Sequence, residues 1–346
     1  MMKDVLNKLF NGKDLSFNET REIFLQIFEE KLSPSQIAGF LVALRMKGES
    51  DEEIAAGASV AREKVVKVNV RRGLGGVSTE EVVFDTCGTG GSGSEKFNIS
   101  TCVAFVVSAS GVMVAKHGNR AASSKCGSAD VLEALGINIQ VPPSVMEEAI
   151  RKVGIGFLYA PLYHKAFKVV APIRKELGIR TIFNILGPLC NPAFSNYQLL
   201  GVYDENLVFK IAKAMRRLGQ KKVMVVFGKD VKDEISLTGR TRVSFLNNKK
   251  IVNFFLSPSD FGLKRCKLKD LEVKDKEESR RVIEGIFAGE KGPARDVVLA
   301  NASVCFYMLR KVKNFKEGVE LGAQLIDEGK VKSKFWEFKR FLEEKG

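Results

Sequence analysis

The sequence predicts an α/β protein: a small N-terminal helical domain, then a larger α/β domain with a central mixed or parallel sheet flanked by helices. Only helical signals occur in the first 70 residues, and three glycines among residues 73–76 then interrupt the pattern. Beyond them, short β-branched runs alternate with helical stretches. A chain of 346 residues that is 45% hydrophobic can bury the cores of two such domains.

The N-terminal helices are predicted from their start signals. Apolar residues at helical spacing follow each start, and no strand-like run interrupts them. Gly73, Gly75 and Gly76 then suit a hinge between domains. The starts are three capping boxes, in which a Ser precedes a Glu or Gln by three positions: Ser16 with Glu19, Ser33 with Gln36, and Ser50 with Glu53.

The α/β part is predicted from runs rich in Val, Ile, Phe and Leu that are four to six residues long. We expect strands at 82–87, 112–115, 199–203 and 223–227, and a hairpin of 242–246 with 250–255 around Asn247-Asn248. Helices are expected from Pro143 and from Asp204, and the chain from 293 to 345 has a helical pattern throughout.

Composition limits the class of partner. The formal net charge of +14 favours polyanions such as nucleic acid, membrane surfaces or phosphorylated metabolites, without choosing among them. The first ten residues contain Lys3, Asp4 and Lys8, unlike a secretory signal, and the apolar run at 102–115 is too short to span a membrane. Six scattered cysteines predict buried thiols more than disulfides or zinc. We expect a cytoplasmic protein with no membrane partner.

A glycine-rich loop, D-T-C-G-T-G-G-S-G at 85–93, follows a predicted strand and precedes a helix near Ile99, where Asn98 or Ser100 could serve as the cap. Such a loop lets backbone amides approach a phosphate, so we expect an anion site. Its glycine spacing also fits a dinucleotide fingerprint, and hence an oxidoreductase. The next predicted strand ends in basic residues rather than the acidic residue that binds NAD ribose, which favours another phosphate but leaves NADP open.

Several motifs then resemble those of the anthranilate phosphoribosyltransferases. They are G-T-G-G at 88–91, N-I-S-T at 98–101, K-H-G-N-R at 116–120 and G-S-A-D at 127–130. Segments 164–174 and 178–192 and the pair Asp233-Glu234 also match, in order, so that the resemblance runs from about residue 30 to 310. It is therefore far more specific than any one motif.

The resemblance implies an enzyme that transfers the phosphoribosyl group of phosphoribosyl pyrophosphate to the amino group of anthranilate, in tryptophan biosynthesis, with Mg²⁺ as cofactor. Such a reaction needs neutralisation of the leaving pyrophosphate more than a strong base, because an aromatic amine is already unprotonated. The resemblance also implies a helical domain of residues 1–72 and 165–187, an α/β domain of residues 73–164 and 188–346, and a homodimer formed by the helical domains.

The resemblance assigns the site residues by position. Lys116, His117 and Asn119 would position the substrates, with no strong catalytic acid or base. Phosphoribosyl pyrophosphate would be bound by Gly88, Gly91, Ser92, Lys96, Asn98, Ile99, Ser100, Thr101, Lys116, Ser123, Ser124 and Ser128. Anthranilate would be bound by Gly88, His117, Asn119, His164 and Arg174, and Mg²⁺ by Ser100, Asp233 and Glu234.

The chain departs from the family pattern at three positions. Ser92 stands where the family usually has Asp, Lys96 where it has Thr or Ser, and Phe167 where Met is frequent. The first two changes make the loop more positive, and we hypothesise that they strengthen its hold on pyrophosphate and reduce its demand for metal. Two alternative functions are a catalytically inactive, nucleic-acid-binding relative, which the charge suggests, and a pyrimidine nucleoside phosphorylase, although the latter lacks K-H-G-N-R in this form.

Overall fold

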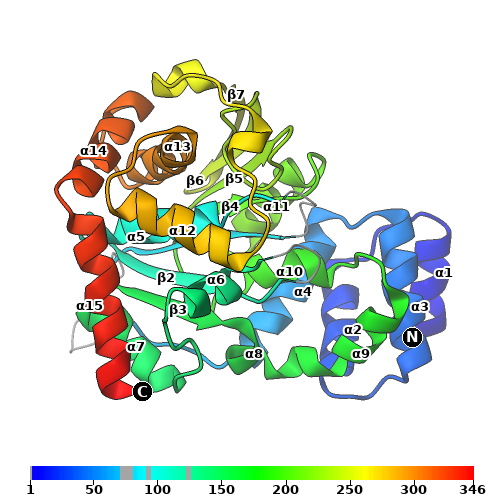
Figure 1. Ribbon diagram of the computed structural model, residues 1–346. Coiled ribbons are helices and arrows are strands. Elements are labelled where there is room, and N and C mark those ends of the chain that lie inside the picture. Colours follow the sequence, from blue (N-terminus) through cyan, green and yellow to red (C-terminus); the bar gives the residue numbers. More distant parts are fainter. Residues whose placement is uncertain (1, 71–80, 91–94, 122–125) are drawn as a thin grey trace.

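The computed structural model describes residues 2–70, 81–90, 95–121 and 126–346. Figure 1 shows a helical region on one side and a larger region, built on a sheet with helices packed around it, on the other. The predicted fold class is confirmed. The three glycines expected at a hinge, Gly73, Gly75 and Gly76, lie outside the described residues.

The first four helices follow one another without an intervening strand, as predicted. The three capping boxes are formed: each Ser hydroxyl accepts a backbone N–H three residues later, and the Glu or Gln there accepts the N–H of the Ser. A cap of this kind stabilises a helix by about 1 kcal/mol. The helices are α1 (Met2–Phe10), α2 (Phe17–Phe28), α3 (Pro34–Lys47) and α4 (Asp51–Lys64).

A second segment of the chain returns to these helices. It consists of η1 (Lys165–Val169), α9 (Ala171–Leu177) and α10 (Phe183–Leu189). Its aromatic side chains join the core of the helical region: Phe167 stacks on Phe28 with ring centroids 5.6 Å apart, and Phe183 lies 5.6 Å from Phe24. Residues more than 130 positions apart therefore share one apolar cluster.

The central sheet has seven strands in the order β3-β2-β1-β4-β5-β6-β7. The first five in this order are parallel, and β6 and β7 form the predicted antiparallel hairpin. The strand β3 was not predicted, because its five residues contain a glycine and are too few for a clear alternation. The strands are β1 (Val83–Gly88), β2 (Met113–Gly118), β3 (Ile155–Tyr159), β4 (Tyr197–Gly201), β5 (Lys222–Gly228), β6 (Thr241–Asn247) and β7 (Lys250–Leu256).

The remaining helices cover the sheet. The C-terminal stretch predicted as helical forms three helices with short breaks rather than one continuous run. Among the described residues, no helix is both long and apolar enough to cross a membrane. The helices are α5 (Ile99–Ala109), α6 (Ser128–Ala134), α7 (Pro143–Lys152), α8 (Ala160–Tyr163), α11 (Leu207–Arg217), α12 (Lys276–Phe287), α13 (Pro293–Met308), α14 (Phe315–Asp327) and α15 (Lys330–Lys345), with short turns η2 (Pro258–Phe261) and η3 (Leu268–Asp270).

The two faces of β4 and β5 belong to different cores. Leu199 and Met224 pack with α5 and α12–α15, whereas their neighbours Leu200 and Val223 pack in the cluster that α11 shares with the N-terminal helices. Alternation along a strand sends successive side chains to opposite faces. The sheet therefore carries the helical region on one face through α11.

Four of the parallel strands end in a glycine: Gly88 on β1, Gly118 on β2, Gly201 on β4 and Gly228 on β5. The carboxyl ends of parallel strands meet at one edge, and the strand order reverses there between β1 and β4. Ligands of open α/β sheets bind at such a reversal. The candidate site therefore lies at this edge.

Candidate active site

Two of these glycines allow the turn that carries Asp233 to lie against the strand ends. A Cβ atom on Gly88 would stand 2.7 Å from the Asp233 carboxylate, and one on Gly201 would stand 1.8 Å from the Asp233 backbone oxygen. A side chain at Gly201 would collide with backbone, whereas one at Gly88 would push the Asp233 carboxylate aside. Gly201 was not predicted, and its only signal is its place at the end of an apolar run.

Asn301 on α13 holds the backbone of Ile235, the residue that follows the acidic pair. Its Oδ1 accepts the N–H of Ile235 at 2.9 Å, and its Nδ2 donates to the Ile235 carbonyl oxygen at 3.2 Å. Asn301 is fully buried, so these bonds are shielded from water. Sequence reasoning missed it, although an Asn inside the apolar run of α13 was a signal.

The three predicted metal ligands lie together. Ser100, Asp233 and Glu234 line one small cavity, narrower than a water molecule, with Thr86 and Cys87 nearby. Burial, together with the neighbouring Asp233, raises the pKa of Glu234 to about 7, although Lys96, Lys116 and a hydrogen bond from the Ser100 backbone act in the opposite direction.

This oxygen donor set is of the kind that Mg²⁺ prefers. The described residues contain no group of three or more His, Cys, Asp or Glu side chains arranged to hold a metal ion. A cation at the pair would therefore need further oxygen ligands, such as those of a phosphate.

Two lysines accompany the acidic pair. Lys96 Nζ lies 2.5 Å from Asp233 Oδ1 and 2.5 Å from the carbonyl oxygen of Val231. Lys116 on β2 is buried and donates to the Thr86 carbonyl oxygen at 2.5 Å and to Ser100 Oγ at 3.2 Å. Burial lowers the pKa of Lys116, and nearby carboxylates oppose that shift. Both positions were predicted as phosphate ligands, and both lie beside the predicted metal ligands.

The two histidines of the chain form a buried pair. Their Nε2 atoms are 3.0 Å apart, so one ring donates a hydrogen bond to the other. Burial lowers the pKa of His164 to about 4, and burial together with the neighbouring His164 lowers that of His117 well below its usual value. Both rings are therefore neutral at pH 7.

Asp85 fixes the strand that carries His117. Its Oδ1 accepts the backbone N–H of His117 at 3.0 Å, and its Oδ2 accepts Nε2 of Gln198 at 3.1 Å. These bonds join β1, β2 and β4 just below the edge of the sheet. Burial raises the pKa of the Asp85 carboxyl. Sequence reasoning gave this residue no role beyond the start of the loop.

A row of aromatic rings leads from the histidine pair to Arg174. The ring of His164 lies 5.0 Å from that of Phe167, which lies 5.3 Å from Phe183, and the Arg174 guanidinium is 5.7 Å from the Phe183 ring centroid. Burial lowers the pKa of Arg174. Among the described residues it has no carboxylate partner, so its planar fork is available to a carboxylate ligand.

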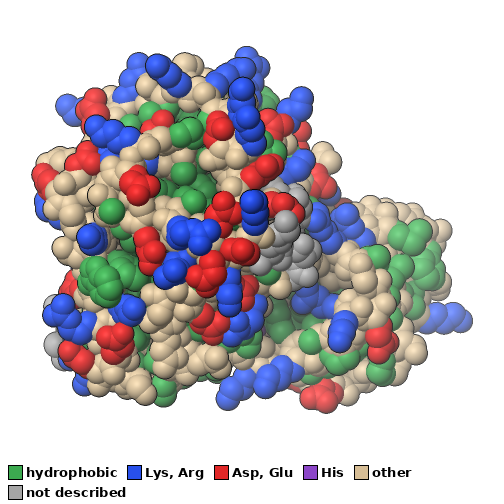
Figure 2. Space-filling view, in the orientation of Figure 1, with side chains coloured by type: hydrophobic (Ala, Val, Ile, Leu, Met, Phe, Trp, Pro, Cys, Tyr) green, Lys and Arg blue, Asp and Glu red, His purple; other side chains and the backbone are tan. Residues whose placement is uncertain are grey.

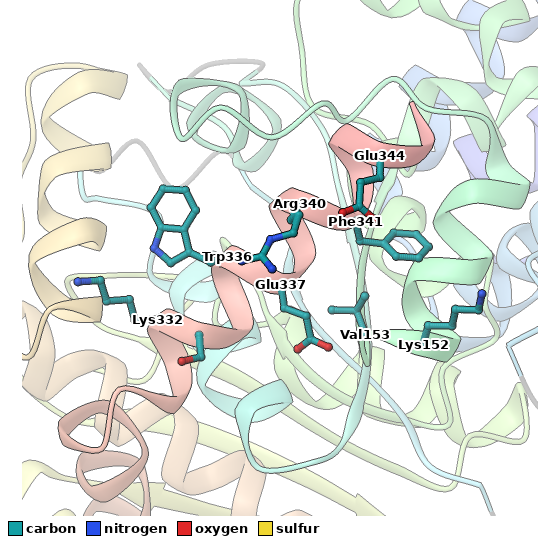
Figure 3. A pocket seen from close by; sticks show the side chains of 9 residues that line it. Lys152, Val153, Lys332, Trp336, Glu337, Arg340, Phe341 and Glu344 are labelled. Carbon is teal, nitrogen blue, oxygen red and sulfur yellow. The ribbon is translucent and has the colours of Figure 1, made fainter.

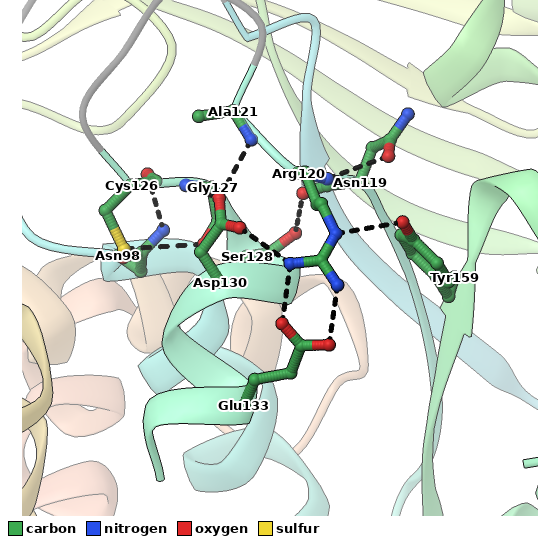
Figure 4. Close-up of polar contacts among 10 residues, drawn as sticks. All are labelled: Asn98, Asn119, Arg120, Ala121, Cys126, Gly127, Ser128, Asp130, Glu133 and Tyr159. Atoms are coloured by element: carbon green, nitrogen blue, oxygen red, sulfur yellow. Dashed lines mark hydrogen bonds and ion pairs between the residues drawn. The ribbon is translucent and has the colours of Figure 1, made fainter. Parts of the chain in front are cut away.

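The K-H-G-N-R loop is held down by its own arginine (Figure 4). Arg120 binds both oxygens of Glu133 at 2.6 and 2.7 Å, Asp130 at 3.1 Å and the Tyr159 hydroxyl at 3.1 Å. Ser128 Oγ donates to the Asn119 carbonyl oxygen at 3.3 Å. The loop and the start of α6 are thus one unit.

Asn98 stands at the N-cap of α5, but its side chain does not cap the helix. Instead, Nδ2 donates to the Cys126 carbonyl oxygen at 3.3 Å, and Oδ1 accepts the Ser279 hydroxyl at 2.8 Å. Of the two candidate caps, Asn98 or Ser100, Asn98 therefore holds the N-cap position without capping the helix through its side chain. Its amide ties Cys126, which precedes the G-S-A-D segment, to Ser279 on α12.

The other predicted phosphate ligands surround the start of α5. Ile99 and Thr101 are buried in its first turn, and the Thr101 hydroxyl has no hydrogen-bond partner within the described part of the chain. Gly91, Ser92, Ser123 and Ser124 lie outside the described residues. The placed residues nonetheless collect at one end of the sheet.

A separate open groove lies between α7 and α15 (Figure 3). Lys152 and Val153 line one side, and Trp336, Arg340 and Phe341 line the other. None of the predicted site residues contributes to it. The groove is therefore distinct from the edge where the motifs meet.

Comparison with known proteins agrees with this geometry. A helical bundle domain of a glycosyl transferase family matches residues 3–65, and the a/b domain of a glycosyl transferase family matches residues 80–332. The anthranilate phosphoribosyltransferase of Petrotoga mobilis is 48% identical over 99% of this chain and 97% of that protein. The chain belongs to the anthranilate phosphoribosyltransferase family. The predicted resemblance is confirmed, and this family member is an enzyme.

Solved structures of the family are similar along their whole length. The enzyme from Thermus thermophilus is 40% identical, with a TM-score of 0.90 over 98% of this chain and 99% of that one. A Saccharomyces cerevisiae enzyme in complex with PRPP and Mg is 29% identical, with a TM-score of 0.88 over 99% of this chain and 98% of that one. Another complex of the yeast enzyme contains 4-fluoroanthranilate, with a TM-score of 0.86 over 99% and 98% of the two chains.

Proposed function

We propose that this enzyme transfers the phosphoribosyl group of phosphoribosyl pyrophosphate to the amino group of anthranilate. The products are N-(5-phosphoribosyl)anthranilate and pyrophosphate, in a step of tryptophan biosynthesis. The observation that carries the proposal is the meeting of the acidic pair, Lys116 and the histidine pair at one edge of the sheet. Family membership and the yeast complex with PRPP and Mg support it.

The phosphoribosyl pyrophosphate subsite is proposed at Gly88 and the start of α5. Backbone N–H groups and the helix dipole favour an anion there, and Lys116 adds a positive charge. Because Lys116 is held by Thr86 and Ser100, its ammonium is positioned before substrate arrives. The proposed ligands are Gly88, Lys96, Asn98, Ile99, Ser100, Thr101, Lys116 and Ser128, with Gly91, Ser92, Ser123 and Ser124 from the segments outside the described residues.

The proposed holders of Mg²⁺ are Ser100, Asp233 and Glu234. Their oxygens suit the ion, and within the described part of the chain no third His, Cys, Asp or Glu joins the two carboxylates, so phosphate oxygens would complete the set of ligands. When bound, Mg²⁺ neutralises charge on the departing pyrophosphate. The protein contributes the placement of the carboxylates, which Gly201 and Asn301 enforce from either side.

The anthranilate subsite is proposed between Arg174 and the histidine pair. Arg174 would bind the carboxylate with its planar fork, and Asn119 and Gly88 would border the ring. Both Nε2 atoms are used within the pair and the other ring nitrogen of His117 bonds to the Gly187 backbone, so Nδ1 of His164 is the ring nitrogen left to accept a hydrogen bond from the amine. Neutral rings also avoid placing a second positive charge beside the ribose carbon that becomes positive during the transfer.

We further propose that residues 1–72 with 165–187 act as the helical domain and residues 73–164 with 188–346 as the α/β domain. Two enzyme copies would associate through the helical domain, because Phe10 on α1 and Met46 on α3 are 71% and 83% exposed. Large apolar side chains of this exposure suggest an interface. Sedimentation equilibrium of the native chain and of a Phe10→Ser, Met46→Ser variant tests this assembly.

A cytoplasmic location is part of the proposal. All six cysteines are free and five of them are buried, which suits a reducing compartment. The nucleic-acid alternative gains no support from the face drawn in Figure 2, where Lys and Arg side chains are interspersed with Asp and Glu rather than gathered in one band.

The decisive experiment follows the fluorescence of anthranilate with the purified enzyme. We expect a loss of fluorescence only when phosphoribosyl pyrophosphate and a divalent metal are both present. Omitting each component in turn supplies the controls. Persistence of anthranilate under every metal condition would defeat the proposal, and salt-sensitive binding of duplex DNA without turnover would favour the nucleic-acid alternative.

A further inference from the structure

The strongest feature that the reaction does not explain is the contact between Lys96 and Asp233. The Nζ atom touches a carboxylate oxygen that would otherwise face a metal ion, and its second bond goes to the carbonyl oxygen of Val231. The side chains are only 8% and 13% exposed. An ion pair shielded to this extent is far less weakened by solvent than a surface pair.

Backbone contacts fix Lys96 in this place. Phe97 N–H donates to the Leu271 carbonyl oxygen at 3.1 Å, and Val273 N–H donates to the Glu95 carbonyl oxygen at 2.6 Å. These bonds form an antiparallel bridge between Lys96 and Glu272. Backbone hydrogen bonds on both sides of Lys96 therefore hold its ammonium group beside the acidic pair.

The charges of this cluster are balanced without a metal. Lys96 and Lys116 carry two positive charges, and Asp233 and Glu234 carry two negative charges when both are ionised. The cavity beside them is narrower than a water molecule. A divalent ion entering alone would displace an ammonium or add two charges to a neutral cluster. Without Lys96, the same cluster would carry a net negative charge whenever both carboxyls are ionised, and would attract the ion.

We propose that Lys96 is a tethered cation that keeps free divalent metal off Asp233 in the substrate-free enzyme. The inference rests on the proposed function of the acidic pair. Metal then enters together with the pyrophosphate group, whose oxygens supply the missing ligands. The ammonium released from Asp233 binds the pyrophosphate, and Lys96 is a positioning residue for the metal as well as a phosphate ligand.

The test is a titration of the substrate-free enzyme with Mn²⁺, followed by the electron paramagnetic resonance signal of the free ion. Mn²⁺ accepts the same oxygen ligands as Mg²⁺. We expect weak binding by the native enzyme and binding about tenfold tighter or more by Lys96→Thr. Adding Asp233→Asn to Lys96→Thr should abolish the gain, because the new affinity resides at that carboxylate.

The matched control is Lys229→Thr, which removes an exposed lysine at the start of the turn that follows β5. It lowers the net charge equally and should leave Mn²⁺ binding unchanged. Equal affinities of Lys96→Thr and the native enzyme would overturn the proposal. Tight Mn²⁺ binding by the native enzyme that is lost on Asp233→Asn would also overturn it. This second measurement does not depend on whether the Lys96 variant folds. No turnover is measured, so failure of the proposed reaction is recognised separately, in the anthranilate assay.

Discussion

The Nε2 atoms of His117 and His164 lie 3.0 Å apart inside the protein, at the end of β2 and after α8. Both side chains are buried, and the contact needs at least one unprotonated ring, because two protonated rings would present only donors to each other. Both rings are therefore neutral over the physiological pH range.

This pairing predicts a pH-dependent stability. The pKa of His164 falls from 6.5 to about 4 on folding, so the unfolded chain binds the proton more tightly. The stability that depends on a neutral His164 is fully present above pH 6.5 and is lost as the pH falls toward about 4. Replacing His164→Gln should reduce the slope of unfolding free energy against pH in this window by about 1.4 kcal/mol per unit. Urea unfolding at several pH values measures it, and parallel curves would refute it.

Arg174 is expected to govern the affinity for anthranilate. Arg174→Gln removes a charged, forked donor that has no carboxylate partner among the described residues. Loss of a charge-assisted hydrogen bond should raise the KM for anthranilate roughly ten- to hundredfold and leave that for phosphoribosyl pyrophosphate unchanged. The control is Lys175→Gln, an exposed neighbour on α9. Equal rises in both KM values would argue against the assignment.

Gly201 is expected to tolerate no side chain. In Gly201→Ala the new Cβ would meet the Asp233 backbone oxygen at 1.8 Å, so the acidic turn must move. We predict a loss of about 1–3 kcal/mol of stability and a higher Mg²⁺ requirement for activity. Thermal unfolding and a Mg²⁺ titration of the rate measure these effects.

The comparison variant for Gly201→Ala is Gly39→Ala inside α3. A Cβ there meets nothing within 4 Å. It should gain about 0.5–1 kcal/mol, because alanine favours a helix. If Gly201→Ala proved as stable and as active as Gly39→Ala, the close approach of Gly201 to Asp233 would not be needed for stability or activity.

Asn301 is expected to act on the acidic pair from a distance. Asn301→Leu leaves the buried N–H of Ile235 without its partner, at a cost of about 1–3 kcal/mol. The loosened turn should also raise the Mg²⁺ concentration needed for half-maximal rate. Ser303→Ala is the control, because that buried hydroxyl bonds only within α13. A stability loss with unchanged Mg²⁺ dependence would leave Asn301 a purely structural residue.

The features predicted correctly from sequence depend on short-range signals. A capping box joins residues three positions apart, such as Ser16 and Glu19, and the hairpin turn needs Asn248, whose φ is +56°. The strand β3 was missed because its apolar run is short. The side chain of Asn98 does not cap α5, because a distant partner, Ser279, competes for it.

The family was also available from motifs, because their residue types carry chemistry that few other sites need. The pairing of charged side chains could not be predicted from the motifs. Lys96 and Asp233 are 137 positions apart, and His117 and His164 are 47 apart, so no local pattern joins them. The sequence by itself determined the N-terminal helices and the α/β alternation that follows them. Only the tertiary structure decided which ammonium faces which carboxylate, because parallel strand ends bring together residues that the chain keeps apart.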